Sequence, residues 1–385
     1  MVDITGAYAV FWTSIAFLLY TYIGYPLLIR LWSWLSPRPL RTSPLLPCMT
    51  LVVVAHNEAR RIQQRLENFL DLDYPWDRLD LILASDGSTD TTAEQARNYH
   101  SEYVQVIEFS QRRGKSAVLN DVIPRAKGEI VVLADVRQRF EANALRALAE
   151  CFSDSEVGAV SGELVLLDGP GRSEVGKGVD FYWRYEKFMR LHESRVDSSV
   201  GVTGAIYALR RSLFMPIPAV TILDDVLIPM EVVRQGYRVL FEPRARAYDW
   251  VTATAREEFM RKLRTIAGNF QLLVLRPWLL NPFSNRLWVQ TVSHKACRLL
   301  SPLGLAAVFG SNLLLLADPD YTGLFAAQAA FYIAAFLGYL TRGAARRPFF
   351  LNVPYAFCLL NWATVVAFVR FLNGRQQVTW ERRAG

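Results

Sequence analysis

Four apolar stretches, each long enough to cross a lipid bilayer, constrain the fold of this 385-residue chain more than any other feature. They cover residues 8–32, 299–317, 322–340 and 349–372. A helix needs ~20 apolar residues to span the ~30 Å hydrocarbon core. The chain is 52% apolar with a formal charge of +7, so it can also build a large soluble core between the first two stretches. We expect membrane helices at both ends and a soluble domain between them.

The first stretch has a competing interpretation as a cleaved signal peptide. No basic residue precedes the apolar run, and the bulky residues Trp32, Trp34 and Leu35 stand where cleavage needs small side chains. We therefore predict an uncleaved anchor.

Basic residues border these stretches and predict their orientation. They are Arg30, Arg38 and Arg41 around the end of the first, Lys295 and Arg298 before the second, and Arg342, Arg346 and Arg347 between the third and fourth. Because Lys and Arg collect on the cytoplasmic side, these flanks and the soluble domain are expected in the cytoplasm, as part of a multi-pass inner-membrane protein. Four full crossings would leave the basic tail (Arg375, Arg382 and Arg383) outside, so either the rule fails there or one stretch is re-entrant or interfacial. Asn352, Pro354 and Asn361 need internal partners, so we expect the last stretch to pack inside the bundle.

The soluble part has the alternating strand and helix pattern of an α/β domain. Short runs rich in β-branched residues at 49–55, 80–85, 104–109 and 129–134 end in polar turns, and helix-like patterns follow. Alternating strands and helices predict a mainly parallel sheet with helices on both faces. Ligands bind such sheets at the carboxyl ends of the strands, where Asn57, Glu58, Asp86 and Asp135 fall. Each residue alone is an ordinary turn or cap residue, but together they indicate a site.

Three segments of this region resemble the motifs of family 2 glycosyltransferases. They are Val53-Val54-Ala55-His56-Asn57-Glu58, Ser85-Asp86-Gly87-Ser88-Thr89-Asp90 and Gly114-Lys115-Ser116-Ala117-Val118-Leu119-Asn120. The resemblance extends over residues 51–271 to the inverting, membrane-associated group that includes cellulose, hyaluronan and poly-N-acetylglucosamine synthases. It implies an α/β GT-A fold, a Rossmann-like domain for nucleotide-diphospho-sugars, with transmembrane helices at both ends.

The resemblance implies a UDP-sugar donor and assigns residues to it. These are Ala55, Asn57, Glu58, Asp86, Lys115, Asp135 and Arg264. A carboxylate such as Asp86 can accept the uracil N–H, Glu58 can hold the ribose or the base edge, and Lys115 can neutralise the diphosphate.

Asp135 matches the first aspartate of the family's D-x-D metal motif, but Arg137 occupies the second position. We expect Mg²⁺ or Mn²⁺, held by Asp135, the phosphates and water, to stabilise the leaving nucleotide. The alternative is that Arg137 itself supports the leaving group.

Asp225 resembles the catalytic aspartate of the family's T-E-D motif and is the predicted general base, with Asp224 beside it. Gly201, Thr203 and Gly204 resemble the acceptor-side loop. The competing interpretation of Asp224 and Asp225 is a pair of helix-capping residues.

Residues 261–265 stand where the family has Q-x-x-R-W, and only Arg264 is kept. Thr265 replaces the tryptophan on which processive synthases stack the acceptor, so long-chain polymerisation is in doubt. Apolar residues recur here at helical spacing with basic residues between them, which is typical of either an interfacial amphipathic helix or a core helix.

These features predict four regions: an N-terminal membrane helix and linker (1–44), a cytoplasmic GT-A domain (45–255), interfacial amphipathic helices (256–295), and C-terminal membrane helices with a basic tail (296–385). The expected function is inverting transfer from a UDP-sugar to a saccharide at the cytoplasmic membrane face, as in exopolysaccharide-type β-glycan synthesis. The alternative is addition of one sugar to a lipid: a polyprenyl phosphate, a ceramide-like lipid or a hopanoid. A nucleotide-binding transporter or scaffold is disfavoured because the apolar stretches contain few charges, no nucleic-acid partner is expected, and a homo-oligomer is left open.

Overall fold

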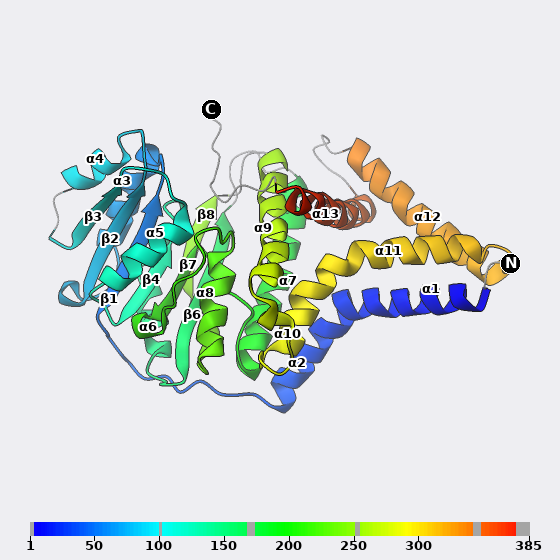
Figure 1. Cartoon of the computed structure of the whole chain (residues 1–385), viewed down its shortest axis with the longest axis horizontal. Helices are drawn as coiled ribbons and strands as arrows, with labels where there is room; N and C mark the ends of the chain where they lie inside the picture. The colour runs from blue at the N-terminus through cyan, green and yellow to red at the C-terminus, as the bar shows by residue number, and fades with distance from the viewer. Residues whose placement is uncertain (1–3, 100–101, 168–173, 251–254, 342–347, 375–385) are drawn as a thin grey trace.

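An eight-stranded mixed sheet forms the centre of the protein (Figure 1). The computed structural model describes residues 4–99, 102–167, 174–250, 255–341 and 348–374. The strands are β1 (Met49–Ala55), β2 (Leu79–Asp86), β3 (Val104–Phe109), β4 (Ile130–Ala134), β5 (Arg139–Phe140), β6 (Val157–Leu167), β7 (Ile206–Arg210) and β8 (Arg238–Trp250), in the spatial order β3-β2-β1-β4-β7-β6-β8-β5. All pairings among β1 to β4 are parallel, whereas β7 and β5 run against their neighbours. The predicted α/β class is confirmed, and the four predicted strands match within one residue.

Helices cover both faces of the sheet because its central strands are apolar on both sides. On β1, Leu51 and Val53 belong to one core cluster, and Val52 between them belongs to the other. The helices α3 (Ala59–Leu70), α4 (Thr92–Asn98) and α6 (Ala144–Cys151) contribute to the first cluster. The helices α5 (Lys115–Val122), α8 (Asp224–Arg234) and α9 (Ala255–Leu275) contribute to the second. The long helix α7 (Glu174–Val196) stands between this domain and the remaining helices (Figure 1).

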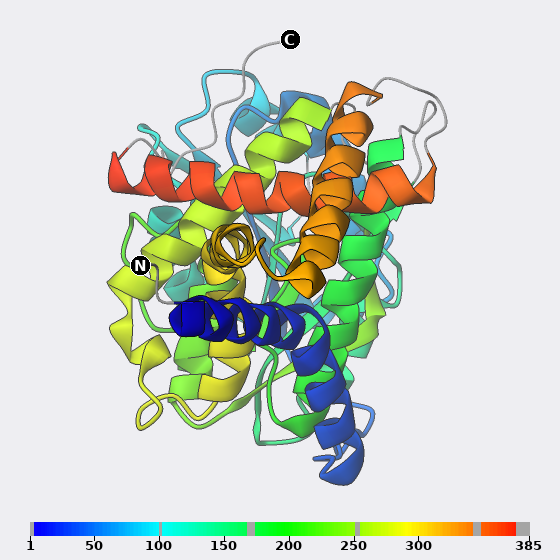
Figure 2. The same cartoon turned by 90° about the vertical axis from the view of Figure 1, so that its right-hand side faces the viewer.

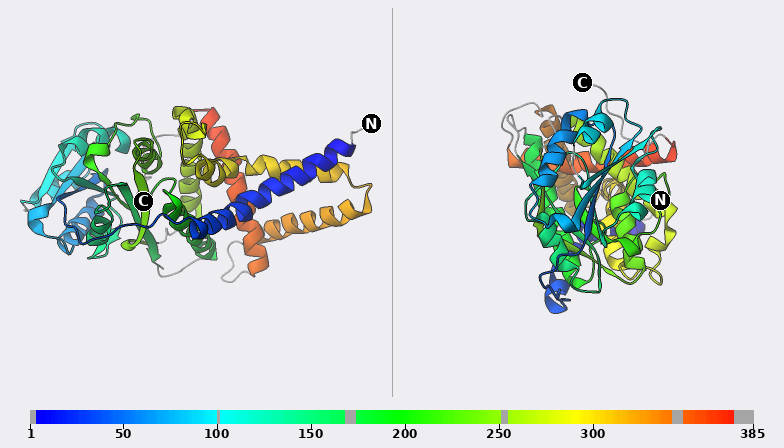
Figure 3. Two further views of the ribbon diagram at one scale, coloured as in Figure 1. Left: turned by 90° about the horizontal axis from the view of Figure 1, so that it is seen from below. Right: turned by 90° about the vertical axis from the view of Figure 1, so that its left-hand side faces the viewer.

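Three helical segments project away from the sheet domain (Figures 1 and 3). The first consists of α1 (Ile4–Leu19), a π-helical turn (Tyr20–Gly24) and α2 (Tyr25–Leu35). The second begins with α10 (Trp288–Thr291) and a π-helical turn (Val292–Ala296) and continues as α11 (Cys297–Leu314), and the third is α12 (Pro319–Leu340). All three are long and apolar enough to cross a membrane. Tyr8 of α1 donates a hydrogen bond to Asp318 between α11 and α12 at 2.9 Å, so the far ends of these segments meet.

The last apolar helix, α13 (Phe349–Leu372), is also long enough to span a membrane, but it lies across the other three. Figure 2 looks along α1 and α11 and shows α13 from the side, whereas Figure 1 shows α13 end-on. Ala363 and Ala367 of α13 pack against Leu263 and Ala267 of α9. The buried Asn361 donates to the carbonyl of Phe357 in its own helix at 2.9 Å. The face of α13 opposite Ala363 and Ala367 leaves large apolar side chains exposed, among them Trp362, Val365, Val369 and Leu372. Residues 342–347 and 375–385, which contain the basic residues between the third and fourth stretches and those of the tail, lie outside the described part of the chain.

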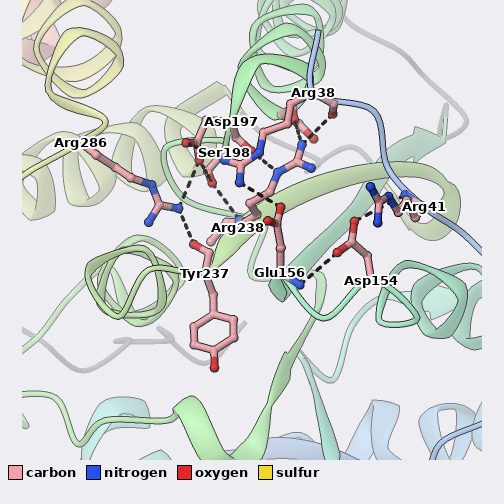
Figure 4. A network of polar contacts seen from close by, with 11 residues as sticks. Arg38, Arg41, Asp154, Glu156, Asp197, Ser198, Tyr237, Arg238 and Arg286 are labelled. Atoms are coloured by element: carbon pink, nitrogen blue, oxygen red, sulfur yellow. Dashed lines mark hydrogen bonds and ion pairs between the residues drawn. The ribbon is translucent and has the colours of Figure 1, made fainter.

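A polar network joins the linker after α2 to the sheet domain (Figure 4). Arg38 pairs with Glu156 at 2.9 Å and with Asp197 at 3.4 Å. The buried Arg238 donates to the carbonyl oxygens of Asp197 and Arg38, both at 3.0 Å. Arg286, just before α10, reaches Asp197 at 3.2 Å. One end of α7 therefore holds the first and second apolar segments in a fixed position relative to the sheet.

Candidate active site

The first two motifs are tied together where β1 and β2 end. Ala55, the last residue of β1, is buried, and Asn57 follows it with a positive φ of 53°. Asn57 Oδ1 accepts a 2.8 Å hydrogen bond from the backbone N–H of Thr89, and the N–H of Asn57 donates to Ser88 Oγ at 3.2 Å. Asparagine tolerates the left-handed conformation of this turn. Ala55 and Asn57 therefore set the positions of two strand-end loops.

Glu58 lies beside this turn at the start of α3. Its backbone N–H donates to Thr92 Oγ1 at 2.8 Å, and its carboxylate is 3.1 Å from Arg61. Burial raises the pKa of Glu58, although Arg61 acts in the opposite direction. Glu58 is thus a partly buried carboxylate at the predicted donor edge of the sheet.

Asp86 fastens the basic loop to the end of β2. It is only 3% exposed, and its two oxygens accept hydrogen bonds from the backbone N–H groups of Arg113 at 2.6 Å and Gly114 at 2.8 Å. Gly87 has a φ of +60°, and a Cβ there would lie 2.3 Å from the nitrogen of Arg112, so only glycine permits this approach. A carboxylate has about four lone-pair sites. Asp86 can therefore hold this loop and still accept from a ligand.

Lys115 connects the donor motifs to the aspartate pair. It begins α5 directly after Gly114, and its Nζ lies 3.0 Å from Asp135 Oδ1 and 3.3 Å from Asp224 Oδ2. Burial opposes the charge of Lys115, but the two carboxylates raise its pKa well above the usual value. Burial would also raise the pKa of Asp135, but Lys115 and Arg137 hold it below its usual value. Residues far apart in the sequence thus form one charged cluster.

Arg137, which replaces the second aspartate of D-x-D, has a carboxylate partner on β8. Its Nη2 lies 3.7 Å from Asp249 Oδ2, and the same oxygen accepts a 2.8 Å hydrogen bond from Gln138. Asp249 is 7% exposed. No recognisable motif surrounds Asp249, so nothing in the sequence singles it out.

Asp224 and Asp225 begin α8, yet neither caps it. Leu223 occupies the N-cap position, and no side chain caps that helix end with a hydrogen bond. Burial raises the pKa of Asp225 to about 6, and Asp224 adds to the increase. Lys115, Arg190 and Lys295 act in the opposite direction. A carboxylate with this pKa can serve as a general base near neutral pH.

The predicted acceptor-side loop lies against Asp225. Gly201 has a φ of +86°, and the next residue, Val202, donates its N–H to the carbonyl of Asp225 at 2.8 Å. A Cβ on Gly204 would lie 3.5 Å from Asp225 Oδ2. Thr203 is buried and donates its backbone N–H to Ser161 Oγ at 3.1 Å. The loop therefore presents backbone and small residues next to the candidate base.

Helix α9 contributes Arg264, a cation that acts on the aspartates of the site. The guanidinium of Arg264 is buried, which lowers its pKa, and the charges of Asp224, Asp225 and Asp135 oppose that effect. On the same helix, Gln271 accepts a 2.9 Å hydrogen bond from the N–H of Ile222. Thr265, in the place of the family tryptophan, is exposed. Arg264 is thus near the aspartates, whereas position 265 faces away from the buried part of the helix.

Two residues of the third motif have a role that the sequence did not reveal. Asn120 donates to the carbonyl of Ile217 at 2.7 Å and accepts from its N–H at 3.0 Å. Ser116 donates to the carbonyl of Thr221 at 2.8 Å. Both contacts fix the segment that leads to Asp224. The motif could be recognised in the sequence, but the segment that it holds could not.

Residues 50–215 match the family model for glycosyl transferase family 2. This part of the chain is a family 2 glycosyltransferase domain. The chain is 24% identical over 249 residues to the probable glycosyltransferase YdaM of Bacillus subtilis, covering 60% of this chain and 57% of the relative. It is 23% identical over 233 residues to poly-beta-1,6-N-acetyl-D-glucosamine synthase of Staphylococcus aureus, covering 59% and 55%. These matches span little more than half the length of each relative.

A solved structure confirms the GT-A fold. The mannosyltransferase PcManGT from Pyrobaculum calidifontis, in complex with GDP-Man and Mn²⁺, superposes with a TM-score of 0.69 at 22% identity. The match covers 94% of this chain and 99% of that one. It therefore includes the helices on both sides of the family 2 domain.

Proposed function

We propose that this protein is an inverting glycosyltransferase that moves a sugar from a UDP-sugar to a saccharide hydroxyl at the cytoplasmic face of the inner membrane. The observation that supports it best is the meeting of Lys115, Asp135 and Asp224 in one cluster, with Asp225 and Arg264 beside it. The named relatives, one of them a poly-beta-1,6-N-acetyl-D-glucosamine synthase, support exopolysaccharide-type β-glycan synthesis.

In this proposal, each part of the cluster has one task. Asp86 and Glu58 hold the nucleoside, while Lys115 and Arg264 neutralise the diphosphate. Asp225 accepts the proton of the acceptor hydroxyl as its oxygen attacks the anomeric carbon. The bond from that carbon to the diphosphate oxygen breaks, and UDP leaves with the electron pair. Attack from the face opposite the nucleotide inverts the anomeric centre.

A divalent cation, Mg²⁺ or Mn²⁺, fits this site as a partner of Asp135. The Asp135 side chain is 34% exposed, at the end of β4, so it can reach a bound ion. Within the described ranges, no group of three His, Cys, Asp or Glu residues could hold a metal. The donor phosphates and water must therefore complete the oxygen ligands that such ions prefer. The ion would stabilise the negative charge that develops on the nucleotide.

Addition of a single sugar to a lipid acceptor is the second candidate. Thr265 stands where processive members of the family have an aromatic platform, and it is exposed. The mass of the product would separate one addition from many.

A screen for UDP release across common UDP-sugars, with detergent-solubilised protein and a native membrane extract, tests the proposal. We expect one donor to be turned over, with saturation by acceptor from the extract. Absence of turnover with every UDP-sugar, in protein that binds UDP, would contradict a UDP-sugar transferase.

For the membrane arrangement, we propose three crossings by the segments of α1–α2, α11 and α12, with α13 lying in the plane of the interface. The crosswise direction of α13 and its exposed apolar face support this arrangement (Figure 2). The C-terminal side of α13 would then stay with the catalytic domain, which removes the conflict with the positive-inside rule. A topology reporter fused after residue 374 should report the same side as one inserted in the sheet domain. Four crossings would place it on the opposite side.

A further inference from the structure

A buried polar cluster joins the membrane segments to helix α7. His294, in the π-helical turn before α11, and Glu193 of α7 are both 0% exposed. His294 Nδ1 lies 2.8 Å from Glu193 Oε1, and His294 Nε2 lies 3.0 Å from Glu186 Oε2. From the first membrane segment, Tyr25 of α2 donates a 2.7 Å hydrogen bond to the same oxygen of Glu193. Both membrane segments therefore reach α7 through one pair of acidic side chains.

The hydrogen-bond partners determine the charges within this cluster. Glu186 accepts a hydrogen bond from the guanidinium of Arg298. Glu193 accepts one from the hydroxyl of Tyr25, and burial would raise its pKa, but the charge and hydrogen bond of His294 hold that pKa below its usual value. Both acids are therefore ionised. Because a carboxylate can only accept, both ring nitrogens of His294 are donors.

The second oxygen of Glu193 holds the acceptor-side loop. Glu193 Oε2 accepts a 3.2 Å hydrogen bond from the backbone N–H of Val200, the residue directly before that loop. Two residues further on, Val202 donates its N–H to the carbonyl of Asp225 at 2.8 Å. A path of hydrogen bonds and a short stretch of backbone thus connect the buried cluster to the candidate base.

Two π-helical turns provide the side chains of this cluster. Tyr25 directly follows the turn at Tyr20–Gly24, and His294 lies within the turn at Val292–Ala296. Tyr20 and Ser293, one from each turn, are hydrogen bonded at 2.7 Å, so the turns lie side by side where the membrane segments meet the sheet domain (Figure 1). Single π-helical turns inside α-helices are frequent at functional sites.

Stability alone is a weak reason for burying such a cluster. Ionic groups lose their hydration on burial, and well-packed apolar residues of similar volume often give an equally stable or more stable protein. Hydrogen bonds to a charged group, in contrast, are strong and directional, so they fix the positions of their partners. The bond from Val200 to Glu193 brings this effect to the acceptor-side loop.

We propose that His294 is a positioning residue for glycosyl transfer: it orients Glu193 and, through Glu193, holds the acceptor-side loop beside Asp225. This inference rests on the proposed function and concerns how its acceptor site is kept in place. His294 acts through the loop, so the chemical step is unchanged. Because Tyr25 binds the same carboxylate, the packing of both membrane segments against α7 also sets the position of the loop.

Two amide substitutions at position 294 test this role. The NH₂ group of asparagine takes the place of Nδ1 and can still donate to Glu193, whereas that of glutamine takes the place of Nε2 and donates to Glu186. His294→Gln should lower kcat/KM for the acceptor about 10- to 100-fold, as when a hydrogen bond to a buried charge is lost. His294→Asn should keep a value at least about 5-fold higher than that of His294→Gln.

The measurement uses the donor found in the UDP-release screen, with the native membrane extract as the source of acceptor at varied concentration. Equilibrium UDP binding should stay within about 2-fold in both variants, because the donor side is an independent part of the site. The matched control is His192→Gln. His192 is also on α7 and binds Ser33 of the first membrane segment through Nδ1 at 2.7 Å, and its substitution should leave kcat/KM within about 2-fold.

Tyr25→Phe tests the contact from the first membrane segment. It removes only the hydroxyl that donates to Glu193, so kcat/KM for the acceptor should fall about 5-fold. The matched control is Tyr20→Phe, which removes the hydroxyl bonded to Ser293 in the neighbouring turn and should change kcat/KM by no more than about 2-fold.

Three outcomes contradict the inference. The first is an equal kcat/KM for His294→Gln and His294→Asn. The second is a loss of UDP binding as large as the loss of transfer, which would indicate a general structural role. The third is an equal effect of Tyr25→Phe and Tyr20→Phe, which would indicate helix packing alone. Absence of transfer by the wild-type protein with every UDP-sugar would instead refute the proposed function, so the two failures are distinguishable.

Discussion

The donor side and the acceptor side of the site are built differently. On the donor side, Asn57 and Asp86 stand at the ends of β1 and β2, and each bonds to the backbone of another loop. Lys115 begins α5 and pairs with Asp135 and Asp224. On the acceptor side, Asp225 begins α8, and two cations that act on it electrostatically, Arg190 and Lys295, come from α7 and the turn before α11. The first half is therefore fixed by local motifs on a rigid parallel sheet, and the second half by the packing of membrane-proximal helices.

This difference has an electrostatic counterpart. Asp86 and Asp135 on the donor side are bound by backbone N–H groups or by Lys115. On the acceptor side, burial raises the pKa of Asp225, and Lys115 and Arg190 oppose that increase. The donor side therefore holds paired charges, whereas the acceptor side holds a carboxylate whose pKa is raised to about 6. The predictions below test this contrast.

The largest effect is expected for Asp225→Asn. Because the amide cannot accept the acceptor proton, transfer should fall by about 10² to 10⁴-fold while UDP binding is retained. Steady-state transfer and equilibrium UDP binding measure the two halves separately. Asp71→Asn, the same change at an exposed ion pair with Arg139, serves as control. Parallel loss of UDP binding would show that the two sides are not separable.

Removal of divalent metal should have the next largest effect. We expect chelation to reduce transfer by about 100-fold, since a cation contributes several kcal/mol to the developing charge on the leaving nucleotide. Added Mn²⁺ or Mg²⁺ should restore it, and Asp135→Asn should weaken the restoration. An unchanged rate in chelator would mean that Lys115, Arg137 and Arg264 hold the diphosphate alone.

Asp86→Asn should weaken the binding of the donor and leave the binding of the acceptor unchanged. The amide can accept only one of the two backbone hydrogen bonds well, so the loop at residues 112–114 loosens, and we expect the donor KM to rise by about 10-fold. The acceptor KM should be unchanged. Asp80→Asn, at the other end of β2 where Asp80 binds Thr50 at 2.8 Å, is the matched control for stability effects. A rise in both KM values would refute the division of the site.

The pH profile should show the smallest effect. Asp225 is active as a base only when deprotonated, and its pKa is about 6, so transfer should fall up to tenfold per unit as the pH drops below about 6. Arg190→Gln removes a cation that lowers this pKa and should move the acidic limb to higher pH. A flat profile between about pH 5 and 7, or a shift to lower pH in the variant, would argue against Asp225 as the base.

Much of the fold follows from the sequence because its signals are local. The run that became β1 matched the predicted bounds, since β-branched residues buried on both faces favour a central strand. The run that became β3 also matched, although it forms the edge of the sheet and its side chains are partly buried or exposed. The last apolar stretch matched α13 residue for residue. The direction of α13 could not be predicted from the sequence, because length and hydropathy show that a helix is apolar but not what it packs against. Contact of Ala363 and Ala367 with α9 decided it.

The sequence by itself determined the α/β sheet, the strand-end motifs and the apolar helices, because periodicity and turn chemistry act over a few residues. Only the tertiary structure brought Asp224 to Lys115 and gave Arg137 its partner Asp249. The charge balance of a buried group is a sum over neighbours from distant segments. The identity of those neighbours exists only after the helices have packed.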